Sequence, residues 1–145
     1  MKKQLQIGLL SLMAILLLGG CKKNEEETTM ALLLGKWECT YLDEYESYYY
    51  FIKGIPSELG YAITLEFDAE KVYEIRTYNG LRRLNVYDYI YKDGLLNIYA
   101  GSTFATVAAD TYEISLSKET LQMNSTRLHT GSDNIRQNYQ YKRVK

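Results

Sequence analysis

Two cysteines and one histidine are the residues of this chain best suited to nucleophilic or metal chemistry. Cys39 would need a base close by to act as a catalytic thiolate, and His129 is the single histidine that could serve. His129 stands in a polar stretch, and no second histidine or cysteine stands at a metal-ligand spacing from it. We therefore expect His129 to be an exposed loop residue and Cys39 to be a small buried side chain on the inner face of a strand.

Asp43, Glu44 and Glu46 form a cluster of carboxylates that could serve as an acid–base pair or as a calcium site. The regular spacing of a calcium-binding loop is absent, so we expect a solvated turn. The sequence also lacks a glycine-rich phosphate loop after a strand and the Gly-x-Ser-x-Gly pattern of a serine nucleophile. These observations predict a protein that is not an enzyme and that uses no metal or cofactor.

Tyrosine is the outlier of the composition, with 15 of the 145 residues, against one proline and one tryptophan. Tyrosine prefers pleated, half-buried surfaces, so its abundance predicts β structure. The formal net charge is -1, and loss of residues 1–20 with Lys2 and Lys3 would leave 15 basic against 18 acidic groups, or -3. A mildly acidic protein is poorly suited to bind a phosphate backbone, so we expect no nucleic-acid partner.

The N-terminus has the pattern of a cleaved signal peptide. Lys2 and Lys3 form a basic start, residues 7–18 are an apolar run, and two small residues precede Cys21. The run is shorter than the ~20 apolar residues of a permanent membrane span. The quartet Leu18-Gly19-Gly20-Cys21 resembles the bacterial lipobox, which implies cleavage before a lipid-modified Cys21. The alternative is an ordinary signal peptide followed by an incidental cysteine.

The sequence therefore divides into a lipoprotein signal peptide over residues 1–20, a lipidated Cys21 with a flexible linker to residue 31, and a folded domain over residues 32–145. The linker is polar and charged, and we expect it to be disordered. Its basic-then-acidic order resembles surface-export signals of some Gram-negative lipoproteins, although a solvated spacer would look the same. The acylated Cys21 would bind the lipid bilayer and place the protein at the outer membrane, on the periplasmic side or exposed on the surface.

From Leu32 onward the apolar pattern has a period of two, interrupted by turn residues, and it predicts eight to ten short strands. Asn79-Gly80 is typical of a tight hairpin turn. A single helical turn is expected, over Met30 to Leu34. For the strand from Arg83 to Tyr91 the pattern does not tell which face is inside. Short connections favour an antiparallel meander that closes into a barrel, with a two-sheet sandwich as the alternative.

The first and last strands carry a matching pair of residues. Gly35-Lys36-Trp37 opens the domain, and Arg143 stands near the end of the last strand. The Arg143 guanidinium could lie across the Trp37 ring, a contact that contributes roughly 0.5–2 kcal/mol. We expect this contact to join the first strand to the last and so remove two exposed sheet edges.

With these motifs, residues 32–145 resemble the lipocalin-like lipoproteins of Gram-negative bacteria and, more distantly, lipocalins and fatty-acid-binding proteins. The resemblance implies a small antiparallel up-and-down β-barrel of about eight strands. It implies that Gly35, Trp37 and Arg143 pack at the closed end as structural residues that do not touch a ligand. The domain is shorter than a typical lipocalin, which predicts a smaller cavity.

Two functions follow as hypotheses. The first is a binding protein whose barrel holds a small apolar or amphipathic ligand between aromatic walls. The tyrosines expected to point inward and contact this ligand are Tyr41, Tyr73, Tyr112, Tyr139 and Tyr141. The second is a structural module with a filled barrel, which docks an envelope protein through outer aromatic residues. These residues would be Tyr48 to Phe51, or Tyr87, Tyr89 and Tyr91.

Overall fold

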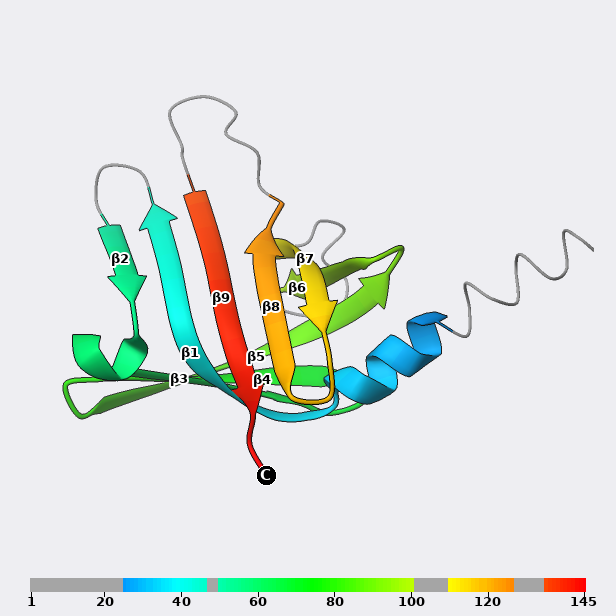
Figure 1. The fold of residues 1–145 in the computed structure, drawn as a ribbon, viewed down its shortest axis with the longest axis horizontal. Helices are drawn as coiled ribbons and strands as arrows, with labels where there is room; N and C mark the ends of the chain where they lie inside the picture. Colours follow the sequence, from blue (N-terminus) through cyan, green and yellow to red (C-terminus); the bar gives the residue numbers. More distant parts are fainter. Residues whose placement is uncertain (1–24, 47–49, 101–109, 127–134) are drawn as a thin grey trace, which may run out of the picture.

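The computed structural model describes residues 25–46, 50–100, 110–126 and 135–145. Within these ranges the chain forms an α-helix over residues 25–33, nine strands and one short 3-10 helix (Figure 1). The strands are β1 (Gly35–Glu46), β2 (Tyr50–Gly54), β3 (Tyr61–Phe67), β4 (Lys71–Tyr78), β5 (Leu81–Lys92), β6 (Leu95–Tyr99), β7 (Asp110–Leu116), β8 (Thr120–Ser125) and β9 (Ile135–Arg143). The 3-10 helix η2 (Pro56–Leu59) lies between β2 and β3.

The sheet is a closed antiparallel barrel. From β3 to β9 each strand pairs with the next, and β1 pairs with both β3 and β9. The closing pair runs from Trp37 opposite Arg143 to Glu46 opposite Ile135. Eight strands form the barrel, and β2 is an additional strand beside the second half of β1. The prediction of a meander barrel of about eight strands is confirmed, and a two-sheet sandwich is not formed (Figure 1).

A β-bulge in β1 changes which side chains face the barrel interior. The register against β9 shifts between Cys39, opposite Tyr141, and Tyr41, opposite Gln140, so that Thr40 is an extra residue. One extra residue reverses the alternation of a strand. Before the bulge, Cys39 is buried on the inside; after it, Leu42 and Glu44 are the residues buried on the inside.

The core is built from the inward faces of the barrel strands. On β3, Ile63, Leu65 and Phe67 are buried, as their alternation predicts. On β5 the inside is the tyrosine face, because Tyr89 is buried whereas Val86 and Ile90 are exposed. This assignment contradicts the hypothesis that Tyr87, Tyr89 and Tyr91 form an outer surface. Phe51 is exposed, and Tyr48 and Tyr49 lie outside the described residues.

Two hairpins use left-handed turn residues. Asn79 and Gly80 have φ of 48° and 79°, as predicted for the tight turn between β4 and β5. Asp93 and Gly94, between β5 and β6, repeat this pattern with φ of 53° and 83°.

The helix over residues 25–33 occupies much of the segment that sequence patterning assigned to a flexible linker. Acidic residues in its first turn favour the helix, because they lie at the positive end of its dipole. Its last residue, Leu33, is fully buried in the barrel core, and Met30 packs against that core. Packing of Met30 and Leu33 against the barrel thus stabilises this helix, although the polar composition of the segment suggested a disordered linker. Within the described part of the chain, no helix is long and apolar enough to cross a membrane.

Candidate functional site

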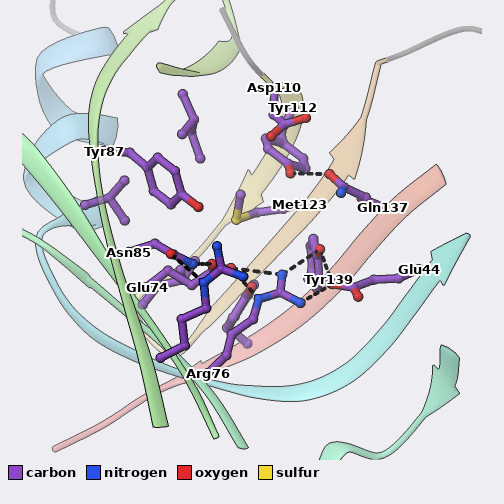
Figure 2. A pocket seen from close by; sticks show the side chains of 15 residues that line it. Glu44, Glu74, Arg76, Asn85, Tyr87, Asp110, Tyr112, Met123, Gln137 and Tyr139 are labelled. Carbon is purple, nitrogen blue, oxygen red and sulfur yellow. Dashed lines mark hydrogen bonds and ion pairs between the residues drawn. The ribbon is translucent and has the colours of Figure 1, made fainter. Parts of the chain in front are cut away.

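A cavity of about 560 Å³ lies inside the barrel (Figure 2). All eight barrel strands contribute side chains to its wall, as expected of a barrel interior. One part of the wall is apolar, and it is formed by Leu65, Val72, Ile98 and Met123. The remainder is polar or aromatic. An apolar wall with a few convergent polar groups is the usual form of a small-molecule site.

Arg76 organises the polar part of this wall (Figure 2). Its Nη1 donates to Glu44 Oε1 at 2.7 Å, and its Nε donates to Glu74 Oε1 at 2.9 Å. Its Nη2 donates to the Tyr139 hydroxyl at 3.1 Å, and that hydroxyl in turn donates to Glu44. Asn85 Nδ2 donates to Glu74 Oε2 at 3.0 Å. We call Glu44, Glu74, Arg76, Asn85 and Tyr139 the Arg76 cluster.

The electrostatics of the cluster keep Arg76 charged. Burial by itself lowers the pKa of Arg76, but the adjoining Glu74, Tyr139 and Glu44 raise it above its ordinary value. Burial raises the pKa of Tyr139, so its hydroxyl keeps its proton and can donate to Glu44. The Arg76 guanidinium carbon also lies 5.9 Å from the centroid of the Tyr139 ring. The cluster is therefore fixed by ionic, hydrogen-bonding and cation–π contacts together.

Three further tyrosines line the cavity. The Tyr112 hydroxyl donates to Gln137 Oε1 at 2.8 Å. Tyr87 points into the cavity in Figure 2, and Tyr141 lines it beside Tyr139. Within the described residues, no hydrogen bond engages the hydroxyl of Tyr87 or Tyr141, so both could serve a ligand. Burial raises the pKa of Tyr87, Tyr112 and Tyr141, which keeps these hydroxyls neutral.

The five tyrosines predicted to contact a ligand divide into two groups. Tyr112, Tyr139 and Tyr141 line the cavity. Tyr41 does not, because the bulge at Thr40 turns it to the outer face, where it is paired with the exposed Gln140. The predicted inward orientation of Tyr41 is therefore wrong.

Tyr73 is also misplaced by the sequence pattern. Val72 is fully buried on β4, so Glu74 and Arg76 share its inward face and Tyr73 lies on the outside. There the Tyr73 hydroxyl donates to Asp68 Oδ2 at 3.0 Å, a contact that raises the pKa of Tyr73. The prediction took the aromatic face of β4 as the inner one, whereas ion pairing allows the charged face to be buried.

The charged half of the site was missed by sequence reasoning. Asp43 and Glu44 were expected in a solvated turn, yet both lie in β1 and are largely buried. Asp43 pairs with Arg136 and Lys53 on the outer side of the strand. One signal in the sequence could have located Glu74 and Arg76. They stand two and four residues after the apolar Val72 in the same strand, so they share its face. No local signal marks Glu44, because its orientation depends on the bulge.

The three residues expected to close the barrel lie together. The Arg143 guanidinium carbon is 4.1 Å from the centroid of the Trp37 ring. Gly35 has φ of 111°, which favours glycine, and a Cβ there would stand 2.9 Å from Arg143 Nη1, so any other residue would also push the guanidinium from its place. This contact lies apart from the cavity, since none of the three residues lines it.

Cysteine chemistry finds no support in the described structure. Cys39 is buried, and burial raises the pKa of its thiol to about 12, which keeps it in the unreactive protonated form. His129 lies outside the described residues. No group of three histidine, cysteine or carboxylate residues arranged to hold a metal occurs in the ranges that the structure describes.

A second cavity, of about 610 Å³, lies outside the barrel between the helix of residues 25–33 and the β5–β6 turn. It is lined by Glu25, Glu26, Thr28, Thr29, Tyr91, Asp93 and Gly94. Most of these residues are exposed, so this groove lacks the enclosing walls of the barrel site.

Comparison with known proteins supports the fold. The structure is similar to a lipocalin-like protein from Bacteroides uniformis, with a TM-score of 0.50 and 13% identity over 78% of this chain and 99% of that one. An uncharacterized protein from Bacteroides eggerthii gives a TM-score of 0.47 and 12% identity over 77% of this chain and 98% of that one. No protein-family model and no curated protein sequence matches this chain. At 13% identity, the similarity to the first of these structures supports the fold alone, a lipocalin-like β-barrel.

Proposed function

We propose that this protein binds a small amphipathic molecule inside its barrel. The observation that carries the proposal is the cavity of about 560 Å³, whose walls combine an apolar part with the Arg76 cluster. Ligand pockets in proteins commonly measure about 300–1,000 Å³ and have a few fixed polar groups on an apolar wall. A ligand with both an apolar and a polar part matches this wall better than a hydrocarbon, which would displace water from the charged groups without replacing its hydrogen bonds.

A neutral fluorescent naphthylamine probe, whose emission rises in an apolar site, tests this proposal. We expect enhanced emission with the unmodified protein and loss of that enhancement with Met123→Trp, which fills the cavity. Gln122→Trp is the matched control, because Gln122 is the adjacent residue of β8 and is exposed on the outer face. Absence of binding to the unmodified protein, or equal binding to both variants, would count against a ligand site in the barrel.

The alternative function is a module that docks an envelope protein. One observation favours it: Leu84 and Val86 on the outer face of β5 are 54% and 48% exposed. They lie opposite Ile75 and Tyr73 of β4, which makes a contiguous apolar strip. A photoreactive amino acid at Val86 would form a discrete protein adduct in cells if the strip is covered. The same group at exposed Gln122, on the distant strand β8, is the control, and absence of an adduct at Val86 would argue against docking.

We further propose that the chain is a lipoprotein, cut before Cys21 and anchored in the outer membrane of a Gram-negative bacterium. The sequence quartet at residues 18–21 and the apolar run before it support this proposal. Cys21→Ser should abolish incorporation of labelled fatty acid and leave the precursor uncut, because the thiol is the site of modification. Continued labelling of this variant would refute the anchor.

The docked helix would then determine how far the barrel stands from the bilayer. Only residues 22–24 separate Cys21 from the described helix, and an extended chain spans at most about 3.6 Å per residue. Because Leu33 is held in the barrel core, the helix cannot swing freely. The barrel would lie close to the membrane surface, where an amphipathic ligand partitions.

A further inference from the structure

The Arg76 cluster contains more negative than positive groups. The side chains of Glu44 and Glu74 are 5% and 13% exposed, and both contact the guanidinium of Arg76. Two carboxylates thus share one cation, which leaves one negative charge uncompensated in the cavity wall. Arg83 and Asp110, which also line the cavity, have opposite charges and leave this balance unchanged.

Arg83 does not neutralise the cluster directly. Its side chain is exposed, and its Nε donates to Asn85 Oδ1 at 3.1 Å. Among the described residues, no ion pair joins Arg83 to Glu44 or Glu74. An uncompensated charge in a poorly solvated cavity is unfavourable unless an opposite charge approaches it. A ligand that enters the barrel can supply that opposite charge.

Arg76 is not free to bind an anionic ligand. Its Nε, Nη1 and Nη2 all donate hydrogen bonds within the cluster. These bonds and the contact of Nη2 with Glu74 occupy most of its N–H groups, and a ligand carboxylate would meet the repulsion of both glutamates. The nearby wall instead offers the rings and hydroxyls of Tyr87 and Tyr141, and aromatic faces attract cations.

We propose that the ligand is an amphipathic cation, with an amine or ammonium group beside Glu44 and Glu74 and an apolar body against the hydrophobic wall. This inference rests on the proposed binding function and specifies its chemical class. It predicts a binding preference opposite to that of a cavity whose arginine is free to pair with a carboxylate.

Three probes of equal chain length test the charge preference: decylamine, decanol and decanoate, titrated calorimetrically at pH 7 below their aggregation concentrations. We expect decylammonium to bind at least about tenfold more tightly than decanoate, with decanol between them, because a charge–charge contact near a protein surface easily exceeds that difference. Binding of decanoate as tight as that of decylammonium would overturn the inference and leave the proposed binding function intact. Failure of all three probes to bind would contradict both.

Variants that replace one carboxylate by a neutral amide show which residue causes the preference for the amine. Glu74→Gln keeps the shape of the side chain and should lower the ratio of amine to carboxylate affinity by about tenfold, with little change for decanol. Glu44→Gln should act in the same direction, and Glu74→Gln alone suffices if the more buried variant does not fold. Glu66→Gln, an identical change on the exposed face of β3, is the control and should leave the ratio unchanged. Equal ratios in Glu74→Gln and Glu66→Gln would overturn the assignment.

Discussion

At the scale of single residues, Arg143 connects three parts of the chain. Its guanidinium covers Trp37, its Nη1 donates to the carbonyl of Leu34 at 2.8 Å, and its Nη2 donates to that of Leu32. Its Nε donates to the carbonyl of Lys118 at 2.7 Å, before β8. Trp37 Nε1 donates to the carbonyl of Leu33 at 2.8 Å. Trp37 and Arg143 therefore satisfy the carbonyls of Leu33 and Leu32, two of those that the end of the helix leaves open.

Replacement of Arg143 by alanine should lower the free energy of unfolding by about 2–4 kcal/mol, because a cation–π contact and several charge-assisted hydrogen bonds are lost. Chemical denaturation monitored by circular dichroism would measure the change. Arg82→Ala is the control: Arg82 is exposed on β5, and its loss should change stability by less than about 0.5 kcal/mol. Equal effects of the two substitutions would show that the closing contact does not stabilise the barrel.

At the scale of elements, the bulge in β1 determines what the cavity contains. If Thr40 were an ordinary paired residue of the strand, alternation from Cys39 would place Tyr41 and Asp43 inside and would turn Leu42 and Glu44 outward. Because Thr40 is an extra residue, Leu42 is 1% exposed and Glu44 reaches Arg76. The bulge thus converts a strand with an aromatic inner face into one that delivers a carboxylate to the site.

Deletion of Thr40 should therefore change the free energy of unfolding by about 1 kcal/mol or less, because it removes the extra residue and leaves a regular strand in which Leu42 and Glu44 still face inward. Thr40→Ala keeps the extra residue and loses only the hydrogen bond from its hydroxyl to the carbonyl of Gln140, at a cost of about 1 kcal/mol or less. Thermal unfolding of the two variants would measure both changes. A loss of about 3 kcal/mol or more in the deletion variant, as expected if Leu42 left the core, would contradict the assignment of Thr40 as the extra residue.

At the scale of the whole molecule, the barrel holds several acidic protons out of water. Burial raises the pKa of Tyr112, Tyr139 and Tyr141, and it raises that of Cys39 to about 12. In the unfolded chain these groups lose their protons near their ordinary values of 9.0 for cysteine and 10.0 for tyrosine. Above pH 9 the unfolded state therefore binds fewer protons than the folded one, so stability falls as the pH rises.

We expect alkaline unfolding to be cooperative and to release the buried tyrosine protons in the same step. Tyrosinate absorbance should rise first for exposed residues such as Tyr78, without loss of circular dichroism, and then rise again together with that loss. Cys39→Val should weaken the dependence of stability on pH between about 9 and 12, because one titrating group is removed. Complete tyrosine ionisation in a protein that retains its circular dichroism would contradict the buried positions.

The sequence by itself determined much of the fold. Alternating apolar residues and hairpin turns such as Asn79-Gly80 are local features, and they predict an antiparallel meander before any long-range contact is known. The end residues Trp37 and Arg143 further indicate that the meander closes. Three of the five tyrosines predicted to contact a ligand, Tyr112, Tyr139 and Tyr141, lie in β7 and β9, whose described residues include no extra residue, and they face the cavity as predicted.

The tertiary structure alone decided the character of the cavity. A bulge is a property of two paired strands, so the pattern of β1 alone could not show that Glu44 turns inward and Tyr41 outward. Burial of Glu74 and Arg76 on β4 likewise depends on partners from other strands, since a buried charge is stable only when it is paired. Residues that make the site polar are therefore those whose orientation depends on distant neighbours, whereas the apolar alternation that builds the barrel is encoded locally.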